Sequence, residues 1–297
     1  MYSRLLFLLL FTLAGLSGRS VQAQDATAEA KAIEAIKLLG GKIENPPPVK
    51  GLPQLKVDLG GTKATDESLK ELRGLKDLTS FHVANTRITD AGLEELSQHK
   101  TLRELSLSDT KITDAGLKHL KALEKLETLF LTDTGITDVG LTQLGQLSNL
   151  SVLSLNDTKI TDAGLKELRG LKELKALTLD ETWITDAGLK ELSGLTNLFF
   201  LKLSNTRITD AGLKDLKSLS NLSYLELDCN PITDAALQEL KSLKKLEHLG
   251  LRRTSITDAG LAELAGFETL KRLDLNRTAT TDAGRKKLQE SLPKVKF

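Results

Sequence analysis

Residues 102–123 read LRELSLSDTKITDAGLKHLKAL, and this stretch decides the fold. Leucines alternate with a polar residue over 105–107, which predicts a short strand with one buried face. Leucines then recur at every third residue over 117–123, which places them on one stripe of a short helix. Between the two patterns, Thr113 and Asp114 supply an N-cap and an acidic first turn. The stretch therefore predicts one strand followed by one helix.

The same pattern recurs along the chain with a fixed period of 24 residues. An aspartate preceded by threonine marks each of ten copies, at Asp66, Asp90, Asp114, Asp138, Asp162, Asp186, Asp210, Asp234, Asp258 and Asp282. In-phase copies of a strand and a crossover helix predict a solenoid with parallel strands about 4.8 Å apart. Helices are about 10 Å wide, so the stack must curve. We expect an α/β horseshoe with a parallel β-sheet on the concave face and short helices on the convex face.

Two columns of small residues keep the same period. The first, the small-residue column, comprises Ser68, Gly92, Gly116, Gly140, Gly164, Gly188, Gly212, Ala236 and Gly260. Because alanine and serine also occur in it, small size for close packing of turns is required more than positive φ. The second, the turn-threonine column, comprises Thr86, Thr110, Thr134, Thr158, Thr182, Thr206, Thr254 and Thr278, joined by Asn230. We expect its side chains to bond to backbone groups of the turns.

The Leu-x-x-Leu-x-Leu-x-x-(Thr/Asn)-x-Ile core resembles the defining segment of the leucine-rich-repeat family. The Ile-Thr-Asp-Ala-Gly-Leu continuation is similar to the helix-bearing subclass found in ribonuclease inhibitor and F-box adaptors. The near-identical copying resembles exported bacterial leucine-rich-repeat proteins. The resemblance covers roughly residues 52–297 and implies a recognition scaffold, without naming a target.

The chain divides into three predicted segments. Residues 1–23 have the order of a secretory signal peptide, with cleavage after Ala23. Their apolar run of about 12 residues is short of the about 20 that span a bilayer, so we expect no membrane span after cleavage. Residues 24–51 predict an N-terminal capping helix and a proline-rich connector. Residues 52–297 form the leucine-rich-repeat domain, with ten repeats and a C-terminal cap.

Both caps have their own sequence signals. Residues 27–39 carry apolar residues on one helical stripe, and the first strand is expected near Lys56. At the other end Arg285 replaces the usual helix leucine, and Val295 and Phe297 are expected to form a last half-strand. Such caps keep the core of the terminal repeats from water.

Composition excludes several classes of function. The chain has 41 basic and 40 acidic residues, and removal of Arg4 and Arg19 with the leader leaves one more acidic than basic residue. A near-neutral chain lacks the field that holds nucleic acid. Cys229 is the only cysteine, so no internal disulfide forms and the packed core must provide stability.

The sequence offers no catalytic constellation. His82 and His248 both fall on strands, but seven repeats separate them, or roughly 34 Å at the inter-strand spacing. His99 and His119 fall on helices and are read as structural. No phosphate-binding loop, His-x-x-x-His pair or cysteine cluster occurs. We therefore expect no enzyme activity, no cofactor and no metal.

Four acidic residues share one exposed position in successive repeats. This acidic strip consists of Asp109, Asp133, Asp157 and Glu181. At about 5 Å in bulk water, each adjacent like pair costs roughly 0.8 kcal/mol before screening. Lys111 and Lys159 are near enough to offset this repulsion, and a basic partner or a bound cation is the functional alternative. Both explanations stay open at the level of sequence.

The candidate partner-binding residues replace polar residues typical of their columns or lie on strand edges. They are Phe130, Trp183, Phe199, Phe200, Tyr224, Arg252, Arg253 and Arg272. Four of the aromatics fall in three adjacent repeats, so we expect them to cluster within roughly 10–15 Å on the concave face. Exposed aromatics of this kind are typical of interface anchors.

These features predict an exported, periplasmic or secreted, non-enzymatic scaffold that binds a protein or peptide partner on its concave face. We expect a monomer. The alternative is a structural or self-associating component of the cell envelope without a specific ligand.

Overall fold

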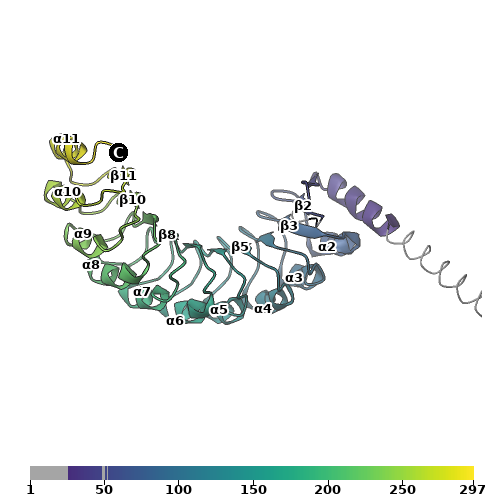
Figure 1. The fold of residues 1–297 in the computed structure, drawn as a ribbon. Helices are drawn as coiled ribbons and strands as arrows, with labels where there is room; N and C mark the ends of the chain where they lie inside the picture. Colours follow the sequence, from purple (N-terminus) through teal and green to yellow (C-terminus); the bar gives the residue numbers. More distant parts are fainter. Residues whose placement is uncertain (1–25, 49–50, 52) are drawn as a thin grey trace, which may run out of the picture.

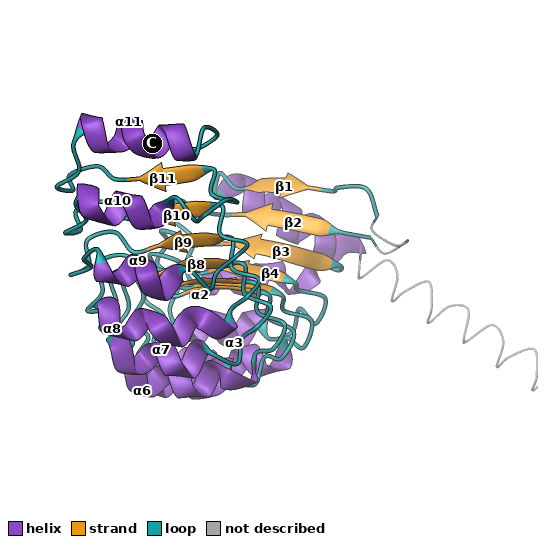
Figure 2. Cartoon of the chain, turned by 60° about the vertical axis from the view of Figure 1, so that its left-hand side comes forward, coloured by secondary structure: helices purple, strands orange, loops and turns teal. Residues whose placement is uncertain are grey.

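The computed structural model describes residues 26–297 apart from residues 49, 50 and 52, and it shows an open horseshoe (Figure 1). The predicted leader, residues 1–23, lies outside the described residues. Strands line the inner curve and helices line the outer curve (Figure 2). The sheet has eleven strands in simple sequence order, from β1 to β11. The predicted α/β horseshoe is confirmed.

The strands are β1 (Lys42–Glu44), β2 (Leu55–Asp58), β3 (Leu78–His82), β4 (Glu104–Ser106), β5 (Thr128–Phe130), β6 (Val152–Ser154), β7 (Ala176–Thr178), β8 (Phe200–Lys202), β9 (Tyr224–Glu226), β10 (His248–Gly250) and β11 (Arg272–Asp274). The helices are α2 (Asp66–Glu71), α3 (Asp90–Leu96), α4 (Asp114–Leu117), α5 (Asp138–Leu144), α6 (Asp162–Leu165), α7 (Asp186–Leu192), α8 (Asp210–Leu213), α9 (Ala235–Leu240), α10 (Asp258–Leu264) and α11 (Asp282–Ser291). Short 3₁₀ turns extend four of them, at Leu72–Gly74, Lys118–Ala122, Lys166–Gly170 and Lys214–Ser218.

The strands from β3 onward pair in parallel with a constant offset of one repeat. Glu104 pairs with Thr128, which in turn pairs with Val152, so equivalent residues stand beside one another. From β4 onward the middle residue of each strand is a fully buried leucine, such as Leu105, and Phe81 takes the same place in β3. The residues on either side face the inner curve. This constant register is what brings side chains of different repeats into rows on the concave face.

The N-terminal edge of the sheet differs from the expected connector. Residues 26–38 form a helix. The sequence predicts only a connector between this helix and the first strand. In the structure β1 forms there and pairs antiparallel with β2. Lys42 stands opposite Asp58 and Glu44 opposite Lys56, so opposite charges face each other across both ends of the pair. The short charged strand covers an edge that would otherwise be free to pair with other chains.

The threonine–aspartate pairs join each repeat to the next. Thr113 caps α4 as predicted, because its side chain accepts a hydrogen bond from the Ala115 amide. The aspartate does more than complement the helix dipole. Oδ1 of Asp90 accepts the Thr113 amide at 2.8 Å, and its Oδ2 accepts the Thr113 hydroxyl at 2.6 Å. The same two bonds recur at every junction from Asp66–Thr89 to Asp258–Thr281.

The small-residue column is explained by these aspartates. A Cβ on Gly164 would lie 2.3 Å from Oδ1 of Asp138, in the preceding repeat. Positive φ is not the reason for these glycines, because only Gly40, Gly51 and Gly61 adopt it among the glycines that the structure describes. The prediction that the column requires small size is therefore confirmed.

The turn-threonine column satisfies carbonyl groups inside each repeat. Thr110 donates to the carbonyl of Leu107, and Thr134 donates to that of Leu131 at 2.6 Å. Asn230 instead connects two repeats, because its amide donates to the Leu203 carbonyl and its Oδ1 accepts from the Thr206 amide. The predicted bonding to the turns is confirmed.

His99 is buried, as its structural reading requires, at a position where other repeats carry leucine. Burial lowers the pKa of the His99 imidazole below its ordinary value of 6.5. The unfolded chain therefore binds more protons than the folded chain as pH falls below about 6.5, and folding stability is lost in that direction.

Replacing His99 with leucine is expected to reduce this loss. The melting temperature should fall less between about pH 7.5 and about pH 5.5 in His99→Leu than in the wild type, because one buried titrating group is gone. Thermal unfolding followed by circular dichroism measures the difference, with His119→Gln as the control. An equal fall in His99→Leu and wild type would show that His99 does not set the pH dependence.

The C-terminal end closes on α11. Arg285 donates to the Leu275 carbonyl at 3.0 Å and so satisfies a backbone group of the last turn. Val295 is buried, and Lys296 pairs with Arg272 of β11 through a single bridge. Phe297, which the sequence places in the cap, is 45% exposed.

Candidate functional site

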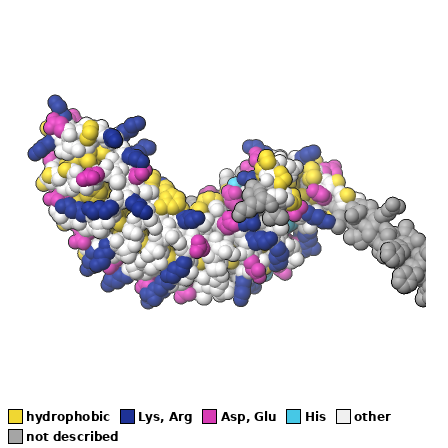
Figure 3. All heavy atoms as spheres, in the orientation of Figure 1, with side chains coloured by type: hydrophobic (Ala, Val, Ile, Leu, Met, Phe, Trp, Pro, Cys, Tyr) yellow, Lys and Arg dark blue, Asp and Glu magenta, His cyan; other side chains and the backbone are white. Residues whose placement is uncertain are grey.

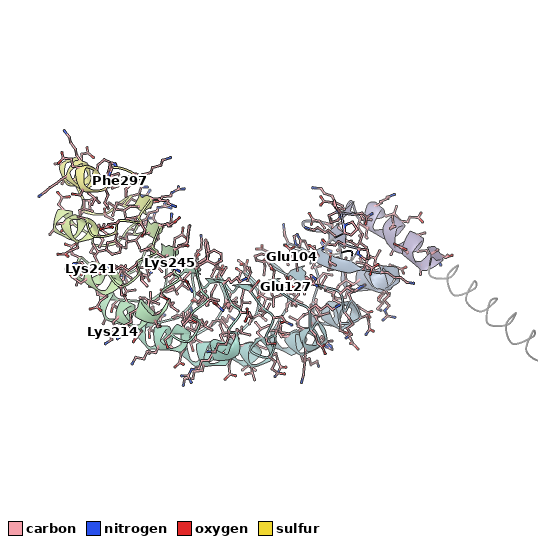
Figure 4. The ribbon with its side chains drawn as sticks, in the orientation of Figure 1. Glu104, Glu127, Lys214, Lys241, Lys245 and Phe297 are labelled. Carbon is pink, nitrogen blue, oxygen red and sulfur yellow. The ribbon has the colours of Figure 1, made fainter. Side chains whose placement is uncertain are left out.

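Two rows of residues line the concave face, and the strand register fixes which residues belong to each row. The first row is Ser80, Glu104, Thr128, Val152, Ala176, Phe200, Tyr224, His248 and Arg272. The second row is His82, Ser106, Phe130, Ser154, Thr178, Lys202, Glu226, Gly250 and Asp274. Figure 4 shows Glu104 of the first row on the inner curve, and Lys214 beside the helices of the outer curve.

Three rings in the first row form a continuous stack. Phe200 and Tyr224 have ring centroids 4.1 Å apart and planes inclined by 17°. Tyr224 and His248 follow at 4.0 Å and 2°. All three side chains are half-buried, so the stack keeps surface toward solvent. Figure 3 shows hydrophobic side chains gathered on the inner curve in the C-terminal half of the molecule. We call Phe200, Tyr224 and His248 the ring stack.

Lys202 and Glu226 hold the ring stack from the second row. The Lys202 ammonium lies 5.9 Å from the Phe200 centroid and 5.8 Å from the Tyr224 centroid, within range of a cation–π interaction. Its Nζ also lies 2.6 Å from Oε2 of Glu226. The Tyr224 hydroxyl donates to Oε1 of the same carboxylate. The rings are therefore fixed before any ligand arrives, which lowers the entropic cost of binding.

The charge states within the stack follow from burial. Burial and the hydrogen bond to Glu226 raise the pKa of the Tyr224 hydroxyl, which stays protonated as a donor. Burial alone would raise the pKa of Glu226, but the hydrogen bonds from Lys202 and Tyr224 outweigh it and the pKa is lowered. Burial lowers the pKa of His248, although Glu226 opposes the shift. The stack therefore presents an apolar, largely neutral surface at neutral pH.

A shallow hollow of about 570 Å³ lies two to three residues beyond the second row. Its charged lining consists of Asp180, Glu181, Asp228, Arg252 and Arg253. Burial raises the pKa of both Asp180 and Asp228, against the hydrogen bonds that they accept from the Ser204 and Arg252 amides. The hollow is therefore polar and carries charges of both signs.

The structure stacks the rings of two of the five predicted aromatics. Phe200 and Tyr224 stack, but Trp183 lies five residues past the end of β7 and is 55% exposed. Phe199 precedes β8 and is 46% exposed, and Phe130 lies in β5. Among the described residues, no ring contact joins these three side chains to the stack. Constant register therefore stacks rings only where they share a position in the repeat, and the wider cluster of four stays a prediction.

The three predicted arginines occupy two separate places. Arg272 follows His248 in the first row and so stands at the end of the ring stack. Arg252 and Arg253 line the hollow. Nε of Arg252 lies 4.0 Å from Asp228 and 3.9 Å from Asp274, so nearby carboxylates already offset its charge.

The acidic strip has a backbone explanation that neither sequence alternative contained. All four residues lie in turns beyond the strands with φ between 50° and 59°, the left-handed region. Aspartate and asparagine tolerate that region better than most residues, and Asn85 and Asn205 occupy the same position. Partial burial, a hydrogen bond to Asp133 and repulsion from the neighbouring carboxylates raise the pKa of Asp109.

Neither the pairing with lysine nor a bound cation gains support at the strip, and a basic partner there stays a hypothesis. Among the described residues, no ion pair joins Lys111 or Lys159 to the strip. Within the same residues, no group of three or more histidine, cysteine or acidic side chains is placed to hold a metal ion.

Sequence reasoning missed His248, Lys202, Glu226 and Gly250. His248 was considered only as a catalytic group, although it shares its column with Phe200 and Tyr224. Gly250 leaves room for the side chains of Glu226 and Asp228, because a Cβ at this position would lie only 2.9 Å from an atom of each. The column position of each residue was the signal that would have found them.

Comparison with known proteins agrees with this architecture. Leucine-rich-repeat family models match residues 124–184, 75–97, 98–121 and 218–241. The crystal structure of internalin C2 from Listeria monocytogenes matches this chain with 30% sequence identity and a TM-score of 0.55. The match covers 68% of this chain and 80% of the internalin C2 chain. The chain therefore belongs to the leucine-rich-repeat family.

A second solved structure, an internalin designated inlF from Listeria monocytogenes, supports the fold alone. It is 21% identical, covers 82% of this chain and 86% of its own, and has a TM-score of 0.54. No curated protein matches the chain. Within the described residues, no helix is both long and apolar enough to cross a membrane. The protein is thus a leucine-rich-repeat scaffold, a class typical of protein binding and generally without enzymatic activity.

Proposed function

We propose that the protein is an exported, non-enzymatic scaffold that binds a protein or peptide partner on its concave face. The observation that carries the proposal is the ring stack of Phe200, Tyr224 and His248, held half-exposed in a row where other repeats carry small or polar residues. Ordered aromatic rings bury a large area for little loss of side-chain entropy, which is why they anchor interfaces.

The surroundings of the ring stack suit a protein surface better than a small molecule. The neighbouring hollow is shallow, and its lining is charged. Small ligands are usually enclosed in deeper and more apolar pockets. A rigid apolar stack beside a charged hollow instead resembles the centre and rim of a protein interface. Export rests on the predicted signal peptide at residues 1–23.

Replacing Phe200 and Tyr224 together with serine is expected to weaken partner binding by about tenfold or more, because both anchors lose their apolar surface. The partner is first captured with purified protein from the secreted and envelope fractions of the producing organism. Isothermal titration calorimetry then compares the wild type, Phe200→Ser/Tyr224→Ser and Val139→Ser. Val139 is 70% exposed on α5, so its replacement controls for loss of apolar surface away from the sheet.

Unchanged affinity in the double variant would contradict binding at the ring stack. If the protein captures only further copies of itself, and light scattering shows a concentration-dependent assembly, the structural role in the envelope replaces the proposed function.

A further inference from the structure

The ring stack ends abruptly on one side, at the place above Ala176. Ala176 follows Phe200 in the first row, and Val152 follows Ala176. Ala176, Phe200 and Val152 all remain partly exposed. The outer face of the Phe200 ring therefore looks across a methyl group toward Val152, without a side chain that continues the stack.

The space above Ala176 has the width of one aromatic ring. Neighbouring strands are about 4.8 Å apart, so the Val152 and Phe200 positions are separated by about 9.6 Å. A ring between them needs two contact distances of about 3.5–4.0 Å each, which fits this span. One wall is aromatic, the other is aliphatic, and the floor is a methyl group. We call this space the Ala176 slot.

We propose that the Ala176 slot receives an aromatic side chain from an extended segment of the partner, which adds a further ring to the stack. This inference rests on the proposed function and names the chemistry of the partner. An arginine of the partner would also stack on Phe200, but its charge would lie against the apolar Val152 side chain. A neutral ring carries no charge to desolvate there, and Val152 offers it a matching apolar wall.

Charge along the same strand gives the partner a direction. Asp180 lies four residues beyond Ala176, or about 13 Å along an extended chain. Glu181 lies beside it in the hollow, and Asp157 occupies the corresponding turn of the preceding repeat. Lys202 of the neighbouring strand is already paired with Glu226 at 2.6 Å, and Arg252 of the hollow lies within 4.0 Å of both Asp228 and Asp274. The partner segment thus carries a lysine or arginine about four residues from its aromatic residue.

The slot is tested by filling it. A displayed library of random linear peptides is selected on the purified wild-type protein, and the enriched peptides are measured against Ala176→Phe and Ala176→Gly. Phenylalanine at 176 continues the stack and occupies the slot, whereas glycine leaves it open. We expect peptides that pair an aromatic with a basic residue, binding about tenfold more weakly to Ala176→Phe and within about twofold of wild type to Ala176→Gly.

Asp180→Asn tests the predicted basic residue of the partner independently of the slot. Asparagine keeps an oxygen for the Ser204 amide but removes the negative charge, so it should weaken the same peptides without changing their aromatic preference. Equal binding of the selected peptides to Ala176→Phe and wild type, with matching thermal midpoints, overturns the slot. If Phe200→Ser/Tyr224→Ser abolishes binding while Ala176→Phe does not, the proposed function stands and only the slot fails.

Discussion

Replacing Gly164 with alanine is expected to lower the free energy of unfolding by about 1–3 kcal/mol. The added Cβ would lie 2.3 Å from Oδ1 of Asp138 and 2.9 Å from a methyl group of Leu141. Asp138 cannot move away freely, because its two oxygens hold the amide and hydroxyl of Thr161. The substitution must therefore shift the turn against its neighbour. Ala236 takes the same place in another repeat and both bonds from Asp210 to Thr233 are kept there, so the junction shifts and does not break. Urea denaturation followed by circular dichroism measures the loss.

Gly170→Ala is the matched control in the same repeat. Gly170 is exposed, and a Cβ there would meet only a backbone oxygen at 3.7 Å, an ordinary contact. Its free energy of unfolding should stay within about 0.5 kcal/mol of wild type. In Asp138→Ala/Gly164→Ala the clash with the carboxylate of residue 138 is absent. The double variant should therefore lose less unfolding free energy than the sum of the losses in the two single variants. Strict additivity would show that the glycine is not required by the aspartate.

Replacing Asp162 with alanine is expected to cost about 2–3 kcal/mol of folding free energy. The change removes two hydrogen bonds, from the Thr185 amide at 2.8 Å and from the Thr185 hydroxyl at 2.6 Å. It leaves a backbone amide at a repeat junction without its partner. Because repeats contact only their neighbours, a weakened junction in the middle of the solenoid also loosens the coupling between its halves.

Glu167→Ala controls for the loss of a carboxylate on the same helical side. Glu167 is exposed, and its replacement should change the urea midpoint little. If Asp162→Ala were as stable as Glu167→Ala, the hydrogen bonds that the aspartates make between repeats would not contribute to stability.

The fold was predictable from sequence because its determinants are local and repeated. The alternating leucines, the helical leucine stripe and the constant period fix the strand register without any knowledge of tertiary contacts. The bonds from Asp90 to Thr113 were not predictable in the same way. An aspartate after a threonine fits a helix cap equally well, and only the close approach of successive turns shows that the carboxylate bonds to the next repeat.

The candidate site was predictable in part. Phe200 and Tyr224 share a column, so constant register alone places their rings together. Trp183 and Phe199 occupy other positions of the repeat, so constant register does not add their rings to the stack. The left-handed turns were not predictable from residue type, because Glu181, Cys229 and Arg253 adopt the same positive φ as Asp109 at this position.

Covalent footprinting of the partner complex tests binding at the ring stack most directly. Side chains are labelled by a photogenerated carbene with and without bound partner, and the labelled positions are found by mass spectrometry. We expect the partner to reduce labelling of Phe200, Tyr224 and His248 and to leave Val139, on α5, unchanged. Protection of Val139 with undiminished labelling of the three rings would contradict recognition on the concave face.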